Sequence, residues 1–93
     1  MVLDPRIYKL AGELYGLLHT GLPVHESGRL SMIFDGDRSV IYSWDLLVDD
    51  RLYEVSYIFS LVELSQTRSL EGLAEWLVYK WKEDMTVATN GRV

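Results

Sequence analysis

The chain has 93 residues, of which 48% are hydrophobic and 25% charged, a balance typical of one globular domain with a single core. Fourteen acidic and nine basic residues give a net charge of -5, which disfavours nucleic acid and anionic membranes as partners and favours a basic protein. The absence of cysteine excludes disulfides, thiolate metal sites and cysteine nucleophiles. No apolar run approaches the ~20 residues that a bilayer requires, and no signal peptide is expected, so we expect a cytoplasmic protein.

The first expected element is a helix that begins at Asp4-Pro5, with an acceptor side chain at the N-cap and proline at the first helical position. We expect it to end near Gly21, because Pro23 cannot continue a helix, and residues 22–28 to form a loop. Apolar residues at three-and-four spacing form one stripe that faces the core. These residues are Ile7, Leu10, Ala11, Leu14, Leu17 and Leu18.

A first β-hairpin is expected next. Its first strand covers residues 29–34 and turns at Asp35-Gly36-Asp37, a typical hairpin signal. A three-residue loop at this turn places the large residues of both strands on one face of the sheet. They are Leu30, Met32, Phe34, Val40 and Tyr42.

The segment 38–61 forms a second hairpin whose two arms match residue for residue when the chain folds at Asp49-Asp50. Side chains alternate faces along a strand, so this register collects large residues on one side and serines on the other. We expect the third strand to be long, about 51–64, with a bend near its end. The predicted pairs are Leu47/Leu52, Leu46/Tyr53, Asp45/Glu54, Trp44/Val55, Ser43/Ser56, Tyr42/Tyr57, Ile41/Ile58, Val40/Phe59 and Ser39/Ser60.

A second helix is expected after the polar segment 65–69, with Ser69 as its N-cap and Glu71 in the favourable first turn. Its stripe ends near Met85, so we expect one domain over residues 1–85 and a frayed tail over 86–93. The predicted stripe consists of Leu70, Leu73, Ala74, Leu77, Val78 and Trp81.

The predicted order of elements is helix, three-stranded antiparallel meander, helix, which makes an α+β fold. Each helix has only one apolar stripe to bury, so we expect both helices on the large-residue face of the sheet. This order resembles the topology of the double-stranded-RNA-binding domain over residues 4–85. That family binds phosphates with lysines at the start of its last helix, where this chain has Glu71 and Glu75 instead. We therefore expect no direct binding of nucleic acid.

The polar residues suggest no catalytic or metal site. His19 and His25, the two histidines of the chain, lack helical spacing and nearby carboxylates at ligand spacing, which indicates solvated loop residues. The aspartates of the two turns lie at opposite ends of the middle strand, roughly 30 Å apart, so they cannot share an ion. We expect no cofactor, no metal and no enzyme activity, because the assignable buried positions are all apolar or aromatic.

The outer face of the sheet is the first candidate binding surface. Its serines and isoleucines form a flat patch that another sheet or helix can approach closely. The like-charged pair Asp45/Glu54 lies on this face; either solvent and a cation such as Arg51 relieve it, or a basic residue of a partner docks there. The candidate residues are Ile41, Ser43, Asp45, Glu54, Ser56 and Ile58.

The last helix offers a second candidate surface. Trp76 and Tyr79 lie away from the buried stripe, and exposed aromatic residues of this kind anchor protein interfaces. The alternative for Trp76 is that its ring folds sideways onto the sheet edge or the first helix.

These observations predict a non-enzymatic protein-binding module, a small acidic inhibitor or adaptor that occupies the surface of a larger, nucleic-acid-handling protein. In size, charge and lack of catalytic motifs the chain resembles the small inhibitors that phages make against host defences, including anti-CRISPR proteins. The alternative is a homo-oligomeric structural or chaperone-like subunit, such as a homodimer joined through the serine-isoleucine face or an edge strand.

Overall fold

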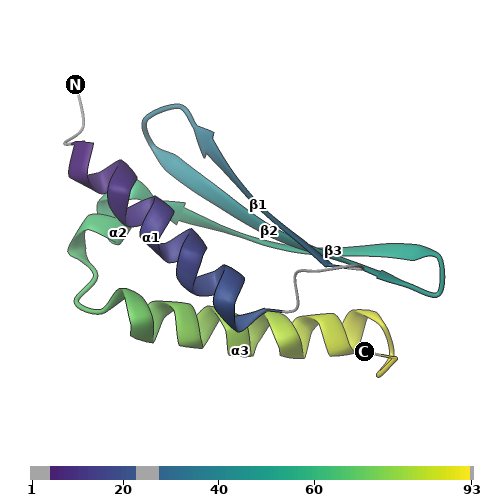
Figure 1. Ribbon diagram of the computed structural model, residues 1–93. Helices are drawn as coiled ribbons and strands as arrows, with labels where there is room; N and C mark the ends of the chain where they lie inside the picture. The colour runs from purple at the N-terminus through teal and green to yellow at the C-terminus, as the bar shows by residue number, and fades with distance from the viewer. Residues whose placement is uncertain (1–4, 23–27, 93) are drawn as a thin grey trace.

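The computed structural model describes residues 5–22 and 28–92. The three strands form one antiparallel sheet in the order β1-β2-β3, and the helices lie together on one side of it (Figure 1). The predicted α+β fold is confirmed, with one additional short helix after the third strand. In chain order the elements are α1 (Pro5–Gly21), β1 (Gly28–Asp35), β2 (Ser39–Val48), β3 (Arg51–Ser60), α2 (Leu61–Gln66) and α3 (Leu70–Ala88).

The register of both hairpins is confirmed. Phe34 pairs with Val40 across the first turn, and all nine predicted β2–β3 pairs are present, including Tyr42 with Tyr57. Asp49 and Asp50 form a two-residue turn with φ angles of 52° and 63°, as a type I′ hairpin turn requires. The alternation of side chains between the two faces of the sheet therefore decides which of them reach the core and which remain outside.

The predicted extension of the third strand to Leu64 is wrong: β3 ends at Ser60, and α2 begins at the next residue. Ser60 is the N-cap, and its hydroxyl accepts a hydrogen bond from the Val62 amide at 3.2 Å. Leu61 and Leu64 are both fully buried. A strand would send residues three apart to opposite faces, whereas a helix brings both onto one side, so burial of the two leucines favours the helix.

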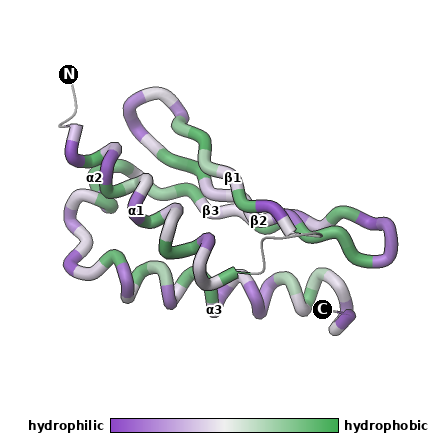
Figure 2. The backbone as a smooth tube through the Cα atoms, viewed as in Figure 1, coloured by the Kyte–Doolittle hydropathy of each residue, from purple (hydrophilic) through white to green (hydrophobic). Residues whose placement is uncertain are grey.

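The core lies between the sheet and the helices, and Figure 2 shows hydrophilic residues at the tips of both hairpins and at intervals along the helices. The predicted helix stripes supply this core, although half of their residues are only partly buried at its margin: Ile7, Leu10 and Leu17 of α1, and Leu70, Leu73 and Val78 of α3. The buried apolar residues are Ala11, Leu14, Leu18, Leu22, Leu30, Val40, Tyr42, Trp44, Leu46, Phe59, Leu61, Leu64, Ala74, Leu77, Trp81 and Met85.

Helix α1 is hydrogen-bonded to the sheet through two tyrosines. The buried Tyr42 hydroxyl donates to the Ala11 carbonyl at 2.7 Å, and Tyr15 donates to the Leu30 carbonyl at 3.2 Å. Burial raises the pKa of Tyr42, so its phenol remains a donor. The helix ends at Gly21, as predicted, whereas the expected N-cap at Asp4 and the stop at Pro23 lie outside the described residues.

Helix α3 begins as predicted, with the Ser69 hydroxyl accepting a hydrogen bond from the Gly72 amide at 3.0 Å. It continues past Met85 to Ala88, and the buried Thr89 hydroxyl donates to the Met85 carbonyl at 2.8 Å. Near the tip of the β2–β3 hairpin, Arg92 contacts Asp49 at 3.5 Å. The C-terminal end of the described chain therefore lies beside this hairpin (Figure 1).

Candidate functional site

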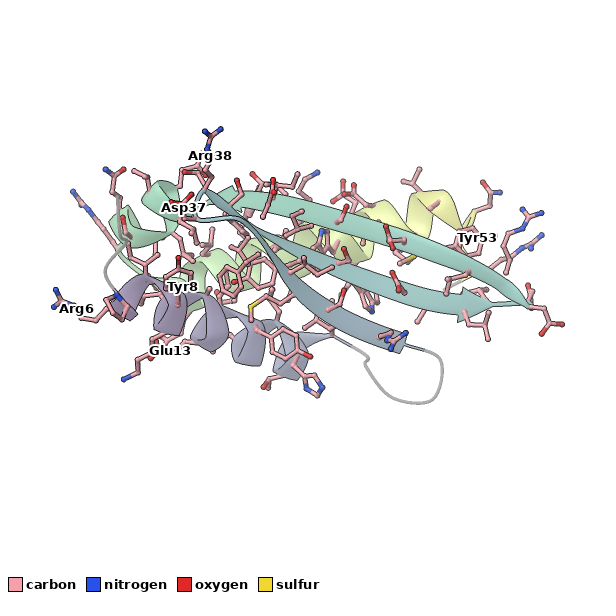
Figure 3. All side chains as sticks on the ribbon, turned by 90° about the horizontal axis from the view of Figure 1, so that it is seen from above. Arg6, Tyr8, Glu13, Asp37, Arg38 and Tyr53 are labelled. Carbon is pink, nitrogen blue, oxygen red and sulfur yellow. The ribbon has the colours of Figure 1, made fainter. Side chains whose placement is uncertain are left out.

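The structure places the eight candidate residues on two separate surfaces. Six of them share the outer face of the sheet: Ile41, Ser43, Asp45, Glu54, Ser56 and Ile58. Trp76 and Tyr79 lie on α3, in the layer behind the sheet. In Figure 3 the three strands lie in front of α3, and the outer face is turned toward the viewer.

The outer face is ordered in rows, because each β1 residue is in register with one residue of β2 and one of β3. Ile33 and Ile58 are each 60% exposed, and Leu52 is 65% exposed, so the apolar part of this face is open to solvent. The rows are Asp35-Ser39-Ser60, Ile33-Ile41-Ile58, Ser31-Ser43-Ser56 and Arg29-Asp45-Glu54, followed by the pair Leu47-Leu52.

The charged row holds two carboxylates side by side. The pKa of Glu54 is raised because its protonated carboxyl can share a hydrogen bond with Asp45, because the two charges repel, and because the site is partly desolvated. The Oδ1 atom of Asp45 is buried and has no hydrogen-bond partner in the described part of the chain. Arg51 cannot relieve the pair, since its register with Val48 places it on the opposite face. Arg29 is the cation of this row, yet no ion pair joins it to Asp45 among the described residues.

On α3 the two aromatic candidates differ in their surroundings. The Trp76 ring meets the Tyr57 ring of β3 edge-on, with centroids 5.5 Å apart, and remains 47% exposed. Tyr79 is 70% exposed and makes no ring contact with any other described residue. Trp76 therefore packs partly against the sheet edge, whereas Tyr79 is free to contact a partner.

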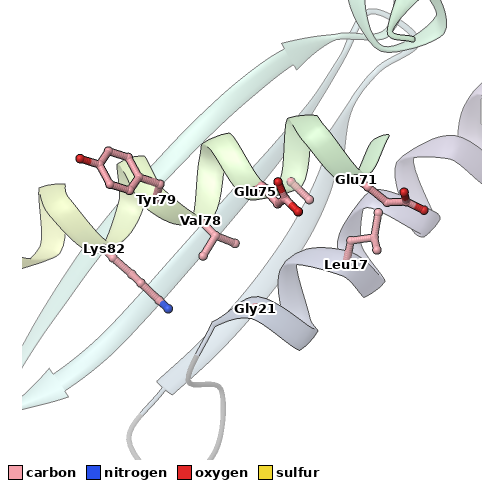
Figure 4. Close-up of a pocket in the computed structure, with 8 residues that line it drawn as sticks. Leu17, Gly21, Glu71, Glu75, Val78, Tyr79 and Lys82 are labelled. Carbon is pink, nitrogen blue, oxygen red and sulfur yellow. The ribbon is translucent and has the colours of Figure 1, made fainter. Parts of the chain in front are cut away.

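A groove of about 400 Å³ lies between α1 and α3, beside Tyr79 (Figure 4). Its apolar floor comes from Leu17 of α1 and from Ala74 and Val78 of α3. Glu71 and Glu75 stand one turn apart at one end, and Lys82 lines the other end. In Figure 4, Leu17 points toward α3, and the sheet lies behind both helices. The lining of this groove is more apolar than that of the second concavity of the described structure, which lies beside α2.

A second concavity, of about 490 Å³ and with a more polar lining, lies between α1 and α2, lined by Ile7, Leu10 and Ser65 with the basic Arg6 and Lys9. Elsewhere, His19 is exposed and lies 6.1 Å from the ring of Tyr15, while His25 falls outside the described residues. Within residues 5–22 and 28–92, no group of three or more His, Asp or Glu side chains could hold a metal ion.

Two parts of these surfaces were not among the predicted site residues. Arg29 could have been found from the sequence, because the register that pairs Leu30 with Trp44 also pairs Arg29 with Asp45. The groove could not, since it depends on how closely α1 approaches α3. The close approach of the two helices is evident at Gly21, where an added Cβ would lie 2.9 Å from Val78 Cγ2.

The chain matches no protein-family model, no curated protein and no solved structure. Among the described helices, none has the length and apolar character needed to cross a membrane. What defines the protein is its own architecture: an α+β domain with an uncovered sheet face on one side and an interhelical groove on the other.

Proposed function

We propose that this chain is a non-enzymatic protein-binding module that captures a basic amphipathic helix of a larger protein in the groove between α1 and α3. The observation that carries the proposal is the groove itself, where an apolar floor borders Glu71, Glu75 and the exposed ring of Tyr79. Exposed tyrosines beside an apolar depression are typical anchors of protein interfaces.

The shape of the groove supports a helical ligand. Its α3 wall runs from Glu71 to Lys82, a length of about 16 Å at the helical rise, which accommodates about three turns of a partner helix. A helix seated in such a groove presents residues at i, i+3, i+4 and i+7 to the apolar floor. Leu17 and Val78 would contact those residues from both sides.

The charge of the rim supports a basic ligand and sets its orientation. Glu71 and Glu75 would pair with lysine or arginine at one end of the bound helix, and Lys82 favours an acidic or polar residue at the other end. The net charge of -5 would attract such a partner at long range.

This mode of binding suits an inhibitor or adaptor in the cytoplasm. A basic helix exposed on a larger protein is often the element that contacts nucleic acid, and covering it would block that contact. The same action is expected of the small phage inhibitors that the chain resembles in size and charge.

The test uses the wild-type chain as bait in extracts of its source cell, followed by direct titration of any protein retained. Tyr79→Ala and Glu75→Lys should each weaken binding at least about tenfold, with the thermal midpoint unchanged. Glu63→Lys, which makes the same charge change on the exposed face of α2 outside the groove lining, should bind as the wild type does. Retention of no protein, or equal binding by all four chains, would overturn the proposal.

A further inference from the structure

No helix or loop among residues 5–22 and 28–92 covers the outer face of the sheet, and the groove lies on the other side of the molecule. Its exposed apolar side chains, Ile33, Ile58, Leu47 and Leu52, come from all three strands. The charged row on the same face contains a buried carboxylate oxygen of Asp45 without a donor. An occupant that suits this face is flat and apolar, and it carries a cation that can face the Asp45/Glu54 carboxylate pair.

A second copy of the same face meets these requirements in one orientation. Consider a two-fold axis that lies between the two sheets and runs parallel to β2. This axis places β1 of one copy over β3 of the other, so each row of residues faces the same row of the second copy. Isoleucines then meet isoleucines and serines meet serines. An axis across the strands at Ser43 would instead set the charged row on the isoleucine row, and an axis at Asp45 would set Arg29 on Arg29.

We propose that two copies of this chain pack outer face to outer face about a two-fold axis that runs along β2, with Arg29 of each copy paired to Glu54 of the other. Packed sheets lie about 10 Å apart, a gap that an arginine side chain can span from one layer to the next. Arg29 then lies between the Glu54 carboxylate of the second copy and the Asp45 carboxylate of its own. The two Asp45 carboxylates face each other near the axis, and this like-charge contact, which the flanking guanidinium groups offset only in part, weakens the dimer.

The dimensions of the face set the strength of this dimer. β2 has 10 residues, and three strands about 4.8 Å apart give a planar face of roughly 400–500 Å² per copy. That is smaller than the ~800 Å² per partner of a standard interface, so we expect a weak, concentration-dependent dimer. Both interhelical grooves stay on the outside of it, so this inference does not depend on the proposed function.

The test is sedimentation of the whole chain at physiological ionic strength, which screens the repulsion between two copies of net charge -5, at concentrations up to about 1 mM. The wild type should approach twice the monomer mass of 10.7 kDa. Arg29→Glu and Glu54→Arg should each weaken self-association at least about tenfold, since each variant places like charges opposite one another twice. An equal mixture of the two variants should associate again, because both cross-copy pairs are then of opposite charge.

Two matched variants and a fold check complete the experiment. Arg68→Glu and Glu83→Arg make the same charge changes on exposed residues away from the sheet, and should associate as the wild type does. The thermal midpoint of each variant shows that it is folded. A monomeric wild type at the highest concentration, or folded variants that do not recover on mixing, would overturn the proposal. Association unaffected by either variant would point to pairing through a sheet edge, and would also overturn it.

Discussion

Single residues in the β2–β3 hairpin work against its stability in two places. Asp45 and Glu54 place like charges directly opposite on the outer face. At the turn, Asp49 and Asp50 both adopt positive φ angles, which a side chain with a Cβ disfavours. The hairpin forms because its inner face buries large residues such as Tyr42 and Trp44, and this burial outweighs the two local costs.

Replacing Glu54 by glutamine should raise the thermal midpoint at neutral pH. The raised pKa of Glu54 means that the folded chain holds this proton more tightly than the unfolded chain, so stability falls as pH rises above the ordinary value of 4.5. The gain from Glu54→Gln should be complete above the raised pKa and absent well below pH 4.5. Thermal unfolding across this pH range at dilute concentration measures it, and Glu63→Gln is the control; a gain independent of pH would contradict this reasoning.

Replacing Asp50 by glycine should stabilise the fold by up to about 1 kcal/mol. Glycine adopts the φ of 63° at this position without a steric penalty, and the β2–β3 register stays the same. Denaturant unfolding of Asp50→Gly beside the wild type measures the difference. A loss of stability would show that the Asp50 side chain contributes more than its backbone conformation costs.

At the scale of elements, α1 shows where a helix has room for stabilising side chains. Gly12 and Gly16 are exposed, and a Cβ added at either would contact nothing within 4 Å. Gly21 at the end of the same helix differs, because its Cβ would press on Val78 of α3. In α1, therefore, the packing of neighbouring side chains does not require glycine at positions 12 and 16, but it favours glycine at position 21.

Gly12→Ala and Gly16→Ala should each stabilise the fold by about 0.5–1 kcal/mol, because alanine has the higher helix propensity. Gly21→Ala should give no gain, since the 2.9 Å approach to Val78 Cγ2 forces that side chain to move. Denaturant unfolding of the three variants provides the comparison. Equal gains at all three positions would mean that α1 and α3 are not held at this distance.

Elements also show why part of the fold escaped prediction. The hairpin registers were predictable, because alternation over ten residues distinguishes one pairing from its neighbours. The sequence predicts a strand for residues 61–64, because four residues are too few to separate a helical period from a continuous apolar run. The decision for a helix came from the burial of Leu61 and Leu64 and from the cap at Ser60.

At the scale of the whole molecule, the packing of α1 on the sheet includes one buried polar contact between distant segments, Tyr42 to Ala11. Tyr42→Phe should destabilise the fold by about 1 kcal/mol through loss of this hydrogen bond. Because burial raises the pKa of Tyr42, stability should fall as pH rises above 10.0, and the variant should lose this part of the alkaline effect. Denaturant unfolding at neutral and alkaline pH measures both; Tyr53→Phe, without a described hydrogen bond, is the control.

The charge of the whole molecule leads to a prediction about nucleic acid. With a net charge of -5 and two carboxylates in the first turns of α3, duplex RNA and DNA should show no retardation with about 10 µM protein at physiological salt. Gel retardation over a range of salt concentrations measures this. Tight binding that weakens steeply with salt would also remove the reason for expecting a basic protein partner.

The sequence by itself determined the type of nearly every element, the register of both hairpins and the faces on which Asp45, Glu54 and Ile58 lie. These features follow from the periods of side-chain direction along a strand and a helix, which are local properties. Only the tertiary structure decided how closely α1 approaches α3 at Gly21 and Val78, and so whether a groove exists beside Tyr79. It also decided that Trp76 leans on Tyr57. Such contacts join segments far apart in the chain, and their distances depend on the volumes of all the side chains packed between them.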